Sequence, residues 1–284
     1  MMIPAWALVL LRYAVRFKGL PRLFRPVTFS DHIMRRLVFD RDPRLTTICD
    51  KVAVKSFVAE RAGDERPVPL VGAWASGAAF AAAELPEMCV VKPSFLSGPF
   101  EIVGPDSDRE ALARTAQGWL SDRLPQRHYS EWGYRAVPRR IMAEPFMSAP
   151  DGGQACEVDV HVFNGRAQLL RVLVGRKLTR ERRDAWFDRS GRQLDIPSHK
   201  IKSHRYALAV DVCHELVEVS EAVSRDFEFM RVDCYITADG VRVGEMTPYP
   251  WGGRPDWADA AVDRQVGELF RPGADTSDFG DYRE

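Results

Sequence analysis

Two acidic residues in the C-terminal part of the chain, Asp233 and Glu245, have the chemistry and the spacing of a metal-binding pair. They fall in two runs of alternating character, residues 230–236 and 241–247. This pattern predicts a hairpin whose three-residue loop, 238–240, has its glycine in the left-handed region. With that loop, Asp233 lies directly opposite Glu245 on one face of the hairpin.

Two carboxylates that face each other across a hairpin repel, so a positive charge is needed between them. A hard divalent cation suits carboxylate oxygens, and we therefore predict a metal site here. On the same face Arg231 lies opposite Thr247, whereas Val232 and Met246 point to the core. The strand then ends in a Pro-, Trp- and Gly-containing loop, where a ligand can approach. The alternative is a slipped register in which both acids are solvated.

The overall composition is that of an ordinary folded protein. Of 284 residues, 45% are hydrophobic and 28% charged, which argues against disorder and is enough for one large domain or two lobes that share a cleft. The formal net charge is zero, so we expect no nucleic-acid partner. The five cysteines are widely spaced and form no CxxC motif, which predicts reduced thiols in a cytoplasmic protein.

The N-terminal segment is apolar and basic. Residues 3–17 are interrupted by Arg12 and Arg16, are too short to span a bilayer and lack a signal-peptide cleavage site. Residues 1–44 carry nine Lys and Arg against three Asp. We expect a first helix that packs on the domain. The alternative is an interfacial helix, residues 3–18, that lies on the anionic inner face of a membrane.

Two helices and a strand–turn–strand unit are expected before the hairpin. Thr28 or Ser30 is expected to cap a helix over residues 31–39. A helix over residues 50–61 places Lys51 and Lys55 on one face, where such a pair is usually just solvated. A short strand (67–71) and an alanine-rich helix (78–84) follow.

A lysine closes the next apolar strand, residues 88–92, and residues 100–103 predict the returning strand. Backbone N–H groups of the small-residue turn 93–98, beside Lys92, are suited to phosphate. The turn has only one glycine, so this signal is weak by itself.

The middle of the chain predicts a hinge and a second hairpin. After a helix over 108–124, the strand 139–146 reaches Glu144 just before Pro145, which suits a hinge between lobes. Asn164-Gly165 is the strongest hairpin signal in the chain. The strand before it places acidic and imidazole side chains on one face, which is either the wall of a polar site or a solvent face: Glu157, Asp159 and His161.

Residues 176–205 carry ten basic groups against four acids. They have little periodicity and predict a long loop, and loops of this length inside a compact domain are often functional. We hypothesise that this loop binds a second, anionic substrate through Arg176, Arg183 and Lys200, with help from Arg254. The alternative is a solvated loop. An amphipathic helix over 206–224 leads into the acidic hairpin.

Five blocks of this sequence, in this order, resemble the TupA-like family of the ATP-grasp superfamily, which occurs in surface-polysaccharide loci. The resemblance covers roughly residues 26–254, most of the chain. The blocks are RPVTFSDHIMRRLVFDRDP, CDKVAVKSFV, YRAVPRRIMAEPF, EVDVHVFNGRAQLLRVLVGR and RVDCYITADGVRVGEMTPYPWGG. The last two, with their spacing, are specific.

The resemblance implies an α+β ATP-grasp fold, in which two α+β lobes with antiparallel sheets grip ATP in the cleft between them. We expect a helical lead-in (1–45), a small nucleotide-binding lobe (46–145), a C-terminal lobe with the metal site (146–255) and an acidic tail (256–284). ATP and Mg²⁺ are the implied cofactors.

The resemblance also implies a role for each matching residue. Lys51 and Lys92 contact nucleotide phosphates, with the turn of Ser97 and Gly98. Glu144 and the Phe146 backbone form the hinge that holds adenine, and Glu157 lies near the ribose. Arg231 lies beside the transferred phosphate and, with Lys92, is expected to be catalytic. The metal ligands are Asp233, Glu245 and Thr247.

Two positions depart from the family pattern. Phe95-Leu96 stands where the family usually has His-Gly, and Asp159 stands in place of a lysine.

The implied function is that of a carboxylate–amine ligase, which forms an amide through an acyl phosphate while it builds or decorates an acidic cell-surface polysaccharide. The expected partners are small-molecule or glycan carboxylates and amines. One alternative is a kinase of the same fold that acts on a sugar or its precursor. The other is a non-catalytic subunit of a polysaccharide biosynthesis complex. The sequence does not name the substrates or the oligomeric state.

Overall fold

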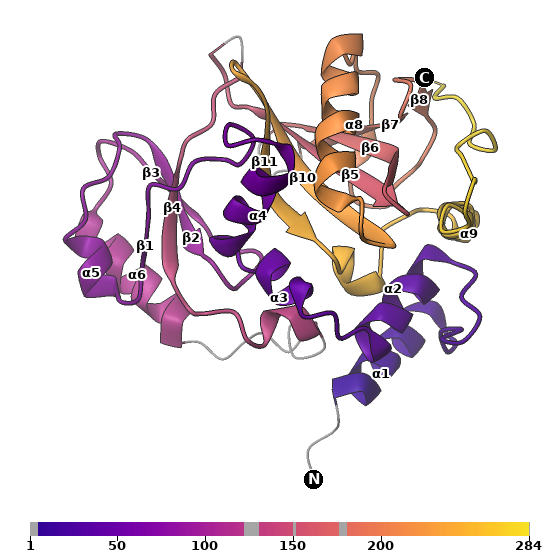
Figure 1. Cartoon of the computed structure of the whole chain (residues 1–284), viewed down its shortest axis with the longest axis horizontal. Helices are drawn as coiled ribbons and strands as arrows, with labels where there is room; N and C mark the ends of the chain where they lie inside the picture. The colour runs from indigo at the N-terminus through magenta and orange to yellow at the C-terminus, as the bar shows by residue number, and fades with distance from the viewer. Residues whose placement is uncertain (1–4, 122–130, 150–151, 176–180, 284) are drawn as a thin grey trace.

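The computed structural model describes residues 5–121, 131–149, 152–175 and 181–283. Within these residues the strands form two sheets, a smaller one of four strands and a larger one of seven. Figure 1 shows the smaller sheet with α5 and α6 on the left and the larger sheet with α8 on the right. The predicted α+β class with antiparallel sheets is confirmed.

The smaller sheet has the strand order β1-β4-β2-β3, and its pairs are antiparallel. Helices α5 and α6 cover it, because buried Phe80, Leu112 and Trp119 pack with Val91 and Ala143 in a separate core cluster. The bounds are β1 (Gly72–Trp74), α5 (Gly77–Ala81), β2 (Cys89–Pro93), β3 (Glu101–Val103), α6 (Arg109–Ser121) and β4 (Ile141–Pro145).

The larger sheet has the order β11-β10-β5-β6-β7-β8, with β9 parallel to β7. Helix α8 lies along one face (Figure 1), where its Leu216 shares a core with Val158, Val160 and Val232. The bounds are β5 (Cys156–Phe163), β6 (Arg166–Val174), β7 (Arg183–Asp188), β8 (Gln193–Leu194), β9 (Lys202–Ser203), α8 (Val210–Ser224), β10 (Phe229–Thr237) and β11 (Gly240–Thr247).

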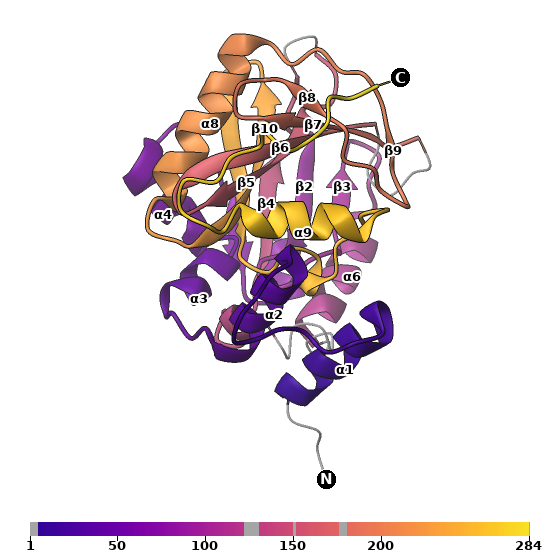
Figure 2. The same ribbon diagram turned by 90° about the vertical axis from the view of Figure 1, so that its right-hand side faces the viewer.

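The remaining helices pack around the larger sheet. α2 (Phe29–Phe39) contacts both α1 (Ala5–Phe17) and α9 (Ala260–Glu268), and α1 lies at one end of the molecule (Figure 2). α3 (Arg44–Cys49) and α4 (Ala53–Ala62) pack against β11. Two short 3₁₀ turns, η1 (Trp132–Tyr134) and η2 (Pro250–Gly253), complete the elements described.

Several local predictions are confirmed. Thr28, one of the two candidate caps, accepts a hydrogen bond from the backbone of Asp31, whose carboxylate completes a capping box for α2. The Asn164-Gly165 turn has positive φ at both residues, 49° and 75°, as a two-residue hairpin turn requires. In the acidic hairpin the predicted pairs are present: Arg231 with Thr247, Val232 with Met246 and Asp233 with Glu245.

The loop of the acidic hairpin differs from the prediction. Thr237 pairs with Gly240, so the turn has two residues, not three. A two-residue turn alone would put Asp233 opposite Gly244. A β-bulge leaves Gly244 without an opposite residue and restores the predicted register beyond it. The carboxylates are therefore opposed because of the bulge and not because of the loop.

Other boundaries were predicted wrongly. The basic segment 176–205 is not a single loop, because β7, β8 and β9 lie within it. The strand expected at 67–71 begins later, as β1, and Pro67 makes only an isolated bridge to Val243. α3 was not anticipated. The last part of the helix predicted over 108–124, residues 122–124, lies outside the described residues.

Two further observations concern the whole described chain. All five cysteines are free, as the sequence predicts. Among the described residues, none of the helices combines the length and the apolar character needed to cross a membrane.

Candidate active site

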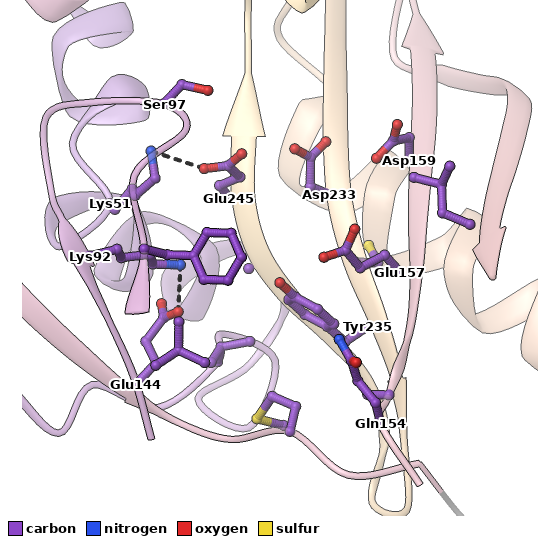
Figure 3. A pocket seen from close by; sticks show the side chains of 18 of the residues that line it. Lys51, Lys92, Ser97, Glu144, Gln154, Glu157, Asp159, Asp233, Tyr235 and Glu245 are labelled. Carbon is purple, nitrogen blue, oxygen red and sulfur yellow. Dashed lines mark ion pairs between the residues drawn. The ribbon is translucent and has the colours of Figure 1, made fainter. Parts of the chain in front are cut away.

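A cavity of about 760 Å³ lies between the two sheets, within the size range of small-molecule sites. Its wall contains every residue that the sequence predicted for binding the nucleotide and the metal, except Thr247, which lies beside it. Figure 3 shows the side chains of both sheets directed towards this space. The predicted residues in the wall are Lys51, Lys92, Ser97, Gly98, Glu144, Phe146, Glu157, Arg231, Asp233 and Glu245.

Asp233 and Arg231 form a bidentate pair on β10. Arg231 donates from Nε and Nη2 to the two carboxylate oxygens of Asp233, each over 2.6 Å. Thr247 on β11 donates from Oγ1 to Asp233 Oδ2 over 3.3 Å. The hydroxyl predicted as third metal ligand thus contacts one of the two predicted carboxylates.

The second carboxylate of the pair is held by a cation from another part of the chain. Glu245 Oε2 lies 3.0 Å from Nζ of Lys51, which stands just before α4 (Figure 3). Positive charge is needed near two opposed carboxylates, and here the chain supplies it from Arg231 and Lys51.

Acidic groups are concentrated around Asp233. Asp159, on the neighbouring strand β5, is its Cα partner on the side away from Glu245. Burial raises the pKa of Asp233 well above its usual value, and the charges of Asp159 and Glu245 add to the rise, against the opposing effect of Arg231. Burial lowers the pKa of the Arg231 guanidinium, but Asp233 and Asp159 outweigh it and raise that pKa above its usual value. A cation placed here is therefore strongly stabilised.

These residues fit a magnesium ion that is bound together with a phosphate. Within the part of the chain that the structure describes, no group of three or more His, Cys, Asp or Glu side chains could hold a metal ion. The protein would supply the Asp233 and Glu245 carboxylates and the Thr247 hydroxyl. Mg²⁺ commonly takes one or two carboxylates and completes its shell with substrate phosphates and water.

Glu144, predicted for the adenine hinge, forms ion pairs with two buried lysines. Its Oε1 lies 2.6 Å from Nζ of Lys55, and its Oε2 lies 2.5 Å from Nζ of Lys92. Burial alone would raise the pKa of Glu144, but Lys92 and Lys55 outweigh it and hold that pKa below its usual value. Burial lowers the pKa of Lys55. For Lys92 the effect of burial is outweighed by Glu144 and Glu245, which raise the pKa. The carboxylate of Glu144 therefore favours the charged form of both lysines.

Lys55 supports the site through Glu144, although it does not line the cavity. Its four-residue spacing from Lys51 predicts only a shared, solvated helix face. In the structure both lysines are buried, and Nζ of Lys55 also donates to the Val68 carbonyl over 2.5 Å. The absence of an acid at helical spacing from this pair was the available signal that their partners lie elsewhere in the fold.

The predicted phosphate turn is anchored by its two unusual residues. Phe95 and Leu96 are both buried, and the Arg139 guanidinium lies over the Phe95 ring at 5.3 Å. Gly98 has a φ of 119°, a conformation that favours glycine. Ser97 and Gly98 remain at the cavity. The Phe-Leu pair therefore fixes the base of the turn, where the family has His-Gly.

The hinge segment follows β4. The backbone N–H of Phe146 donates to the Met88 carbonyl over 3.3 Å. The roles of Phe146 and Glu144 toward adenine remain predictions.

The opposite wall of the cavity comes from β5, β6 and the start of β7. Glu157 forms an ion pair with Arg182. Asp159 lies across from Arg171, whose guanidinium is held by Asp184 over 2.8 Å. The polar face of β5 is thus a site wall and not a solvent face, although His161 is fully buried. Arg171 and Arg182 were not predicted individually for the site.

The cations proposed for a second substrate are only partly in the wall. Lys200 and the adjacent Ile201 line the cavity, whereas Arg183 does not. Arg254 lines a different, small hollow beside Arg12 and Glu131. Arg176 lies outside the described residues. Arg183 and Arg254 therefore do not line this cavity, whereas Arg182, directly before β7, does. Binding of a second substrate by these cations stays a prediction.

Several solved structures resemble this fold. An L-amino acid ligase from Bacillus licheniformis is 14% identical, with 98% of this chain and 59% of that chain covered, at a TM-score of 0.51. The ATP-grasp ligase PsnB with a minimal precursor (13% identity, 80% and 61% covered) and D-alanine–D-alanine ligase from Bacillus anthracis with ATP (14%, 71% and 55%) both have TM-scores of 0.42. This chain thus spans about three fifths of the length of the proteins it matches.

The sequence comparisons identify the family directly. A search of curated proteins found no match. The model of the family described as TupA-like ATPgrasp matches residues 31–271. The match covers most of the chain and includes both sheets and all the predicted site residues. This protein therefore belongs to the TupA-like ATP-grasp family.

Proposed function

We propose that this protein is an ATP- and Mg²⁺-dependent carboxylate–amine ligase that forms an amide through an acyl phosphate. One observation carries the proposal: the opposed carboxylates of Asp233 and Glu245 share a single cavity with Lys51, Lys92 and Arg231. Membership in an ATP-grasp family supports ATP as the nucleotide. The solved structure of similar fold that covers almost the whole chain is described as an L-amino acid ligase.

The reaction has two displacement steps. A carboxylate oxygen of the first substrate attacks the γ-phosphorus of ATP, and ADP leaves with the electrons of the broken bond. An amine nitrogen then attacks the acyl carbon, inorganic phosphate leaves and the nitrogen loses a proton. Neither step needs a nucleophile from the protein, because phosphoryl transfer depends on positioning and charge stabilisation. When held by Asp233, Glu245 and Thr247, Mg²⁺ would supply positive charge that stabilises the negative charge of the phosphates.

The cations that form ion pairs in the cavity would bind the triphosphate and stabilise its negative charge. Arg231 and Lys51 are paired with Asp233 and Glu245 in this structure. An incoming triphosphate competes with these carboxylates for both cations, and the carboxylates that it releases are those assigned to the metal. Lys92 keeps its charge through Glu144 and opposes the negative charge that develops on the transferred group.

The substrates are proposed from charge and family. Arg171, Arg182 and Lys200 bring three cations to one side of the cavity. Each is paired with a carboxylate of the chain, for which the carboxylate of an acidic first substrate could substitute. We propose an acidic sugar or amino acid of a cell-surface polysaccharide, acted on in the cytoplasm.

The test is ATP turnover in the presence of candidate carboxylates and amines. We expect ADP and phosphate release to require both substrates, and hydroxylamine to trap the acyl phosphate as a hydroxamate. Lys92→Met should lower the rate by about a hundredfold or more, the size of effect seen when one charge-stabilising group is lost. A stable phosphorylated product without any amine requirement would identify a kinase. Absence of nucleotide binding would favour a non-catalytic subunit.

A further inference from the structure

The N-terminal region concentrates exposed apolar side chains. The described part of the chain has ten exposed large hydrophobic residues, and six of them lie between positions 6 and 39, with exposed fractions from 50 to 88%. The other four are scattered over positions 70 to 210. The six are Trp6, Leu11, Val15, Leu20, Phe24 and Phe39. The rings of Phe24 and Phe39 are in contact, with centroids 5.9 Å apart. Large exposed apolar side chains that are concentrated in one region indicate an interaction site.

Helix α1 has two apolar sides, of which only one packs on the protein. Val9 and Tyr13 are buried, and the Tyr13 hydroxyl donates to Asp31 Oδ1 over 3.0 Å. Leu11 and Val15, one turn apart, are exposed. Since the inner side already anchors the helix, the outer apolar side is not needed for folding.

The apolar side chains are surrounded by basic ones. Helix α1 itself has no acidic residue. Four exposed basic residues lie in its last turn or shortly after it: Arg16, Lys18, Arg22 and Arg25. The acids of this region are engaged within it. Asp31 is buried and caps α2, Asp40 pairs with Arg36, and Asp42 pairs with Arg44. The exposed surface of this region is therefore positively charged.

The place of α1 in the molecule leaves this surface accessible. In both views α1 lies at one end, beyond α2 (Figures 1 and 2). Its 13 residues make a helix about 20 Å long, shorter than the roughly 30 Å of a bilayer core. The helix is thus suited to lie along an interface.

We propose that this region binds the surface of an anionic phospholipid bilayer, with Leu11, Val15, Leu20 and Phe24 at the acyl boundary and the basic side chains among the headgroups. An interfacial helix combines an apolar face with lysine and arginine in this way. Charge complementarity favours lipid over a second copy of this chain, because a symmetric contact through this face would bring the same cations together. The proposal does not depend on the catalytic function.

The experiment is co-sedimentation of the full chain with vesicles of phosphatidylglycerol and phosphatidylcholine. We expect binding that falls roughly tenfold or more on pure phosphatidylcholine, and also at high salt. Leu11→Ser with Val15→Ser and Phe24→Ser should weaken binding roughly tenfold or more. Lys18→Glu with Arg22→Glu and Arg25→Glu should do the same.

Matched controls exist elsewhere on the surface. Val210→Ser changes a residue that is 66% exposed at the start of α8, and Arg114→Glu changes an arginine whose side chain is 70% exposed on α6. Neither should alter vesicle binding, and all variants should melt as the wild type does. A vesicle-induced blue shift of tryptophan fluorescence that is lost in Trp6→Phe would place α1 at the interface.

Three outcomes would overturn the proposal. The first is no wild-type binding to anionic vesicles. The second is binding that both sets of variants leave unchanged. The third is a dimer in solution that the apolar variant dissociates, which would assign this face to a second copy of the chain.

Discussion

Two neighbouring hairpins of the larger sheet, β5–β6 and β10–β11, have the same construction and different uses. Each has a two-residue turn, and each carries one extra residue on its second strand, Gln168 in the first and Gly244 in the second. In both, the bulge shifts the register by one residue beyond it. The extra residues have different roles. The bulge of β5–β6 holds another segment of the chain, so we call β5–β6 the structural hairpin, although the far end of that hairpin also lines the cavity; the bulge of β10–β11 is part of the cavity wall.

In β5–β6 the bulge and the turn hold the C-terminal segment. The buried Gln168 donates from Nε2 to the Ala274 carbonyl over 2.8 Å. Asn164, in the turn, donates from Nδ2 to the Phe270 carbonyl over 2.9 Å. Farther along the hairpin, Asp159 lies opposite a residue of the opposite charge, Arg171.

In β10–β11 the bulge leaves space for the cavity. A Cβ atom on Gly244 would lie 2.7 Å from Cε2 of Tyr235, and both residues line the cavity. Beyond the bulge Asp233 faces Glu245. Arg231 of the same hairpin pairs with Asp233, and Glu245 pairs with a cation from outside the hairpin, Lys51. The unfavourable pairing of two like charges, Asp233 and Glu245, therefore identifies this hairpin as part of the site.

The largest effect should come from filling the bulge. Gly244→Ala would force the Tyr235 ring into the cavity or break the register that opposes the two carboxylates. We expect a loss of about 2 to 3 kcal/mol in the free energy of unfolding and a drop of roughly tenfold in MgATP affinity, one kcal/mol or more. Chemical denaturation and calorimetric titration measure the two effects.

Gln168→Ala is the matched change in the structural hairpin. It should cost about 1 to 2 kcal/mol of stability through the lost hydrogen bond to Ala274, with MgATP affinity unchanged. If both variants weakened nucleotide binding equally, the distinction between the two bulges would be lost.

A smaller effect is expected from removing the outside cation. Lys51→Met leaves Glu245 opposite Asp233 with less positive charge nearby. Because the Glu245 side chain is 29% exposed, we expect a loss of about 1 to 2 kcal/mol, less than for a fully buried pair, with weaker MgATP binding.

Arg61→Met, in the last turn of α4, removes a cation whose partner Asp226 is half exposed. It should cost less than about 1 kcal/mol and leave nucleotide binding intact. Equal effects of the two variants on MgATP binding would contradict the role given to Lys51.

The smallest effect concerns acid pH and the structural hairpin. His32 stacks on Phe270, the residue that the Asn164 turn holds, with ring centroids 3.7 Å apart. Burial, helped by Arg35 and Arg36, lowers the pKa of His32 from 6.5 to about 4. Between these values the unfolded chain binds a proton that the folded one does not, so stability present above pH 6.5 falls as the pH falls towards 4.

The pKa change of His32 corresponds to a loss of about 2 kcal/mol in the free energy of unfolding at pH 5 if solvent screening is ignored. Because the ring is partly exposed, we expect a loss of about 1 kcal/mol. His32→Phe keeps the stack and should lose correspondingly less stability between pH 7 and pH 5. His161, whose pKa burial lowers well below 6.5, should maintain part of the acid sensitivity in that variant. An identical pH profile for wild type and variant would rule out the assignment to His32.

The sequence predicted the site hairpin well because alternation specifies which residues share a face. The pairs Asp233–Glu245 and Arg231–Thr247 are present as expected. The predicted turn length was wrong: Gly240 has the expected positive φ of 98°, but it already pairs with Thr237, so the loop is only residues 238–239. The compensating bulge depends on the contact between Gly244 and the Tyr235 ring, and no local pattern records such a contact.

Charge partners were the main part of the site that the sequence did not predict. Lys55 and Glu144 are 89 positions apart, and Arg182 became a cavity residue only because the basic segment folds into strands beside Glu157. Long-range ion pairs of this kind follow from how the two sheets and α4 are packed, whereas periodicity reports only on neighbours along one element.

The most direct test of the account is the stability of the protein with and without MgATP, in wild type and in Asp233→Asn with Glu245→Gln. At a hundred times its dissociation constant the ligand should add about 2.7 kcal/mol to wild-type stability, and the double variant should lose this metal-dependent gain. Asp226→Asn with Glu268→Gln, which neutralises two acids outside the cavity, should retain it. No gain in wild type, or an equal gain in the Asp233 and Glu245 variant, would contradict the account.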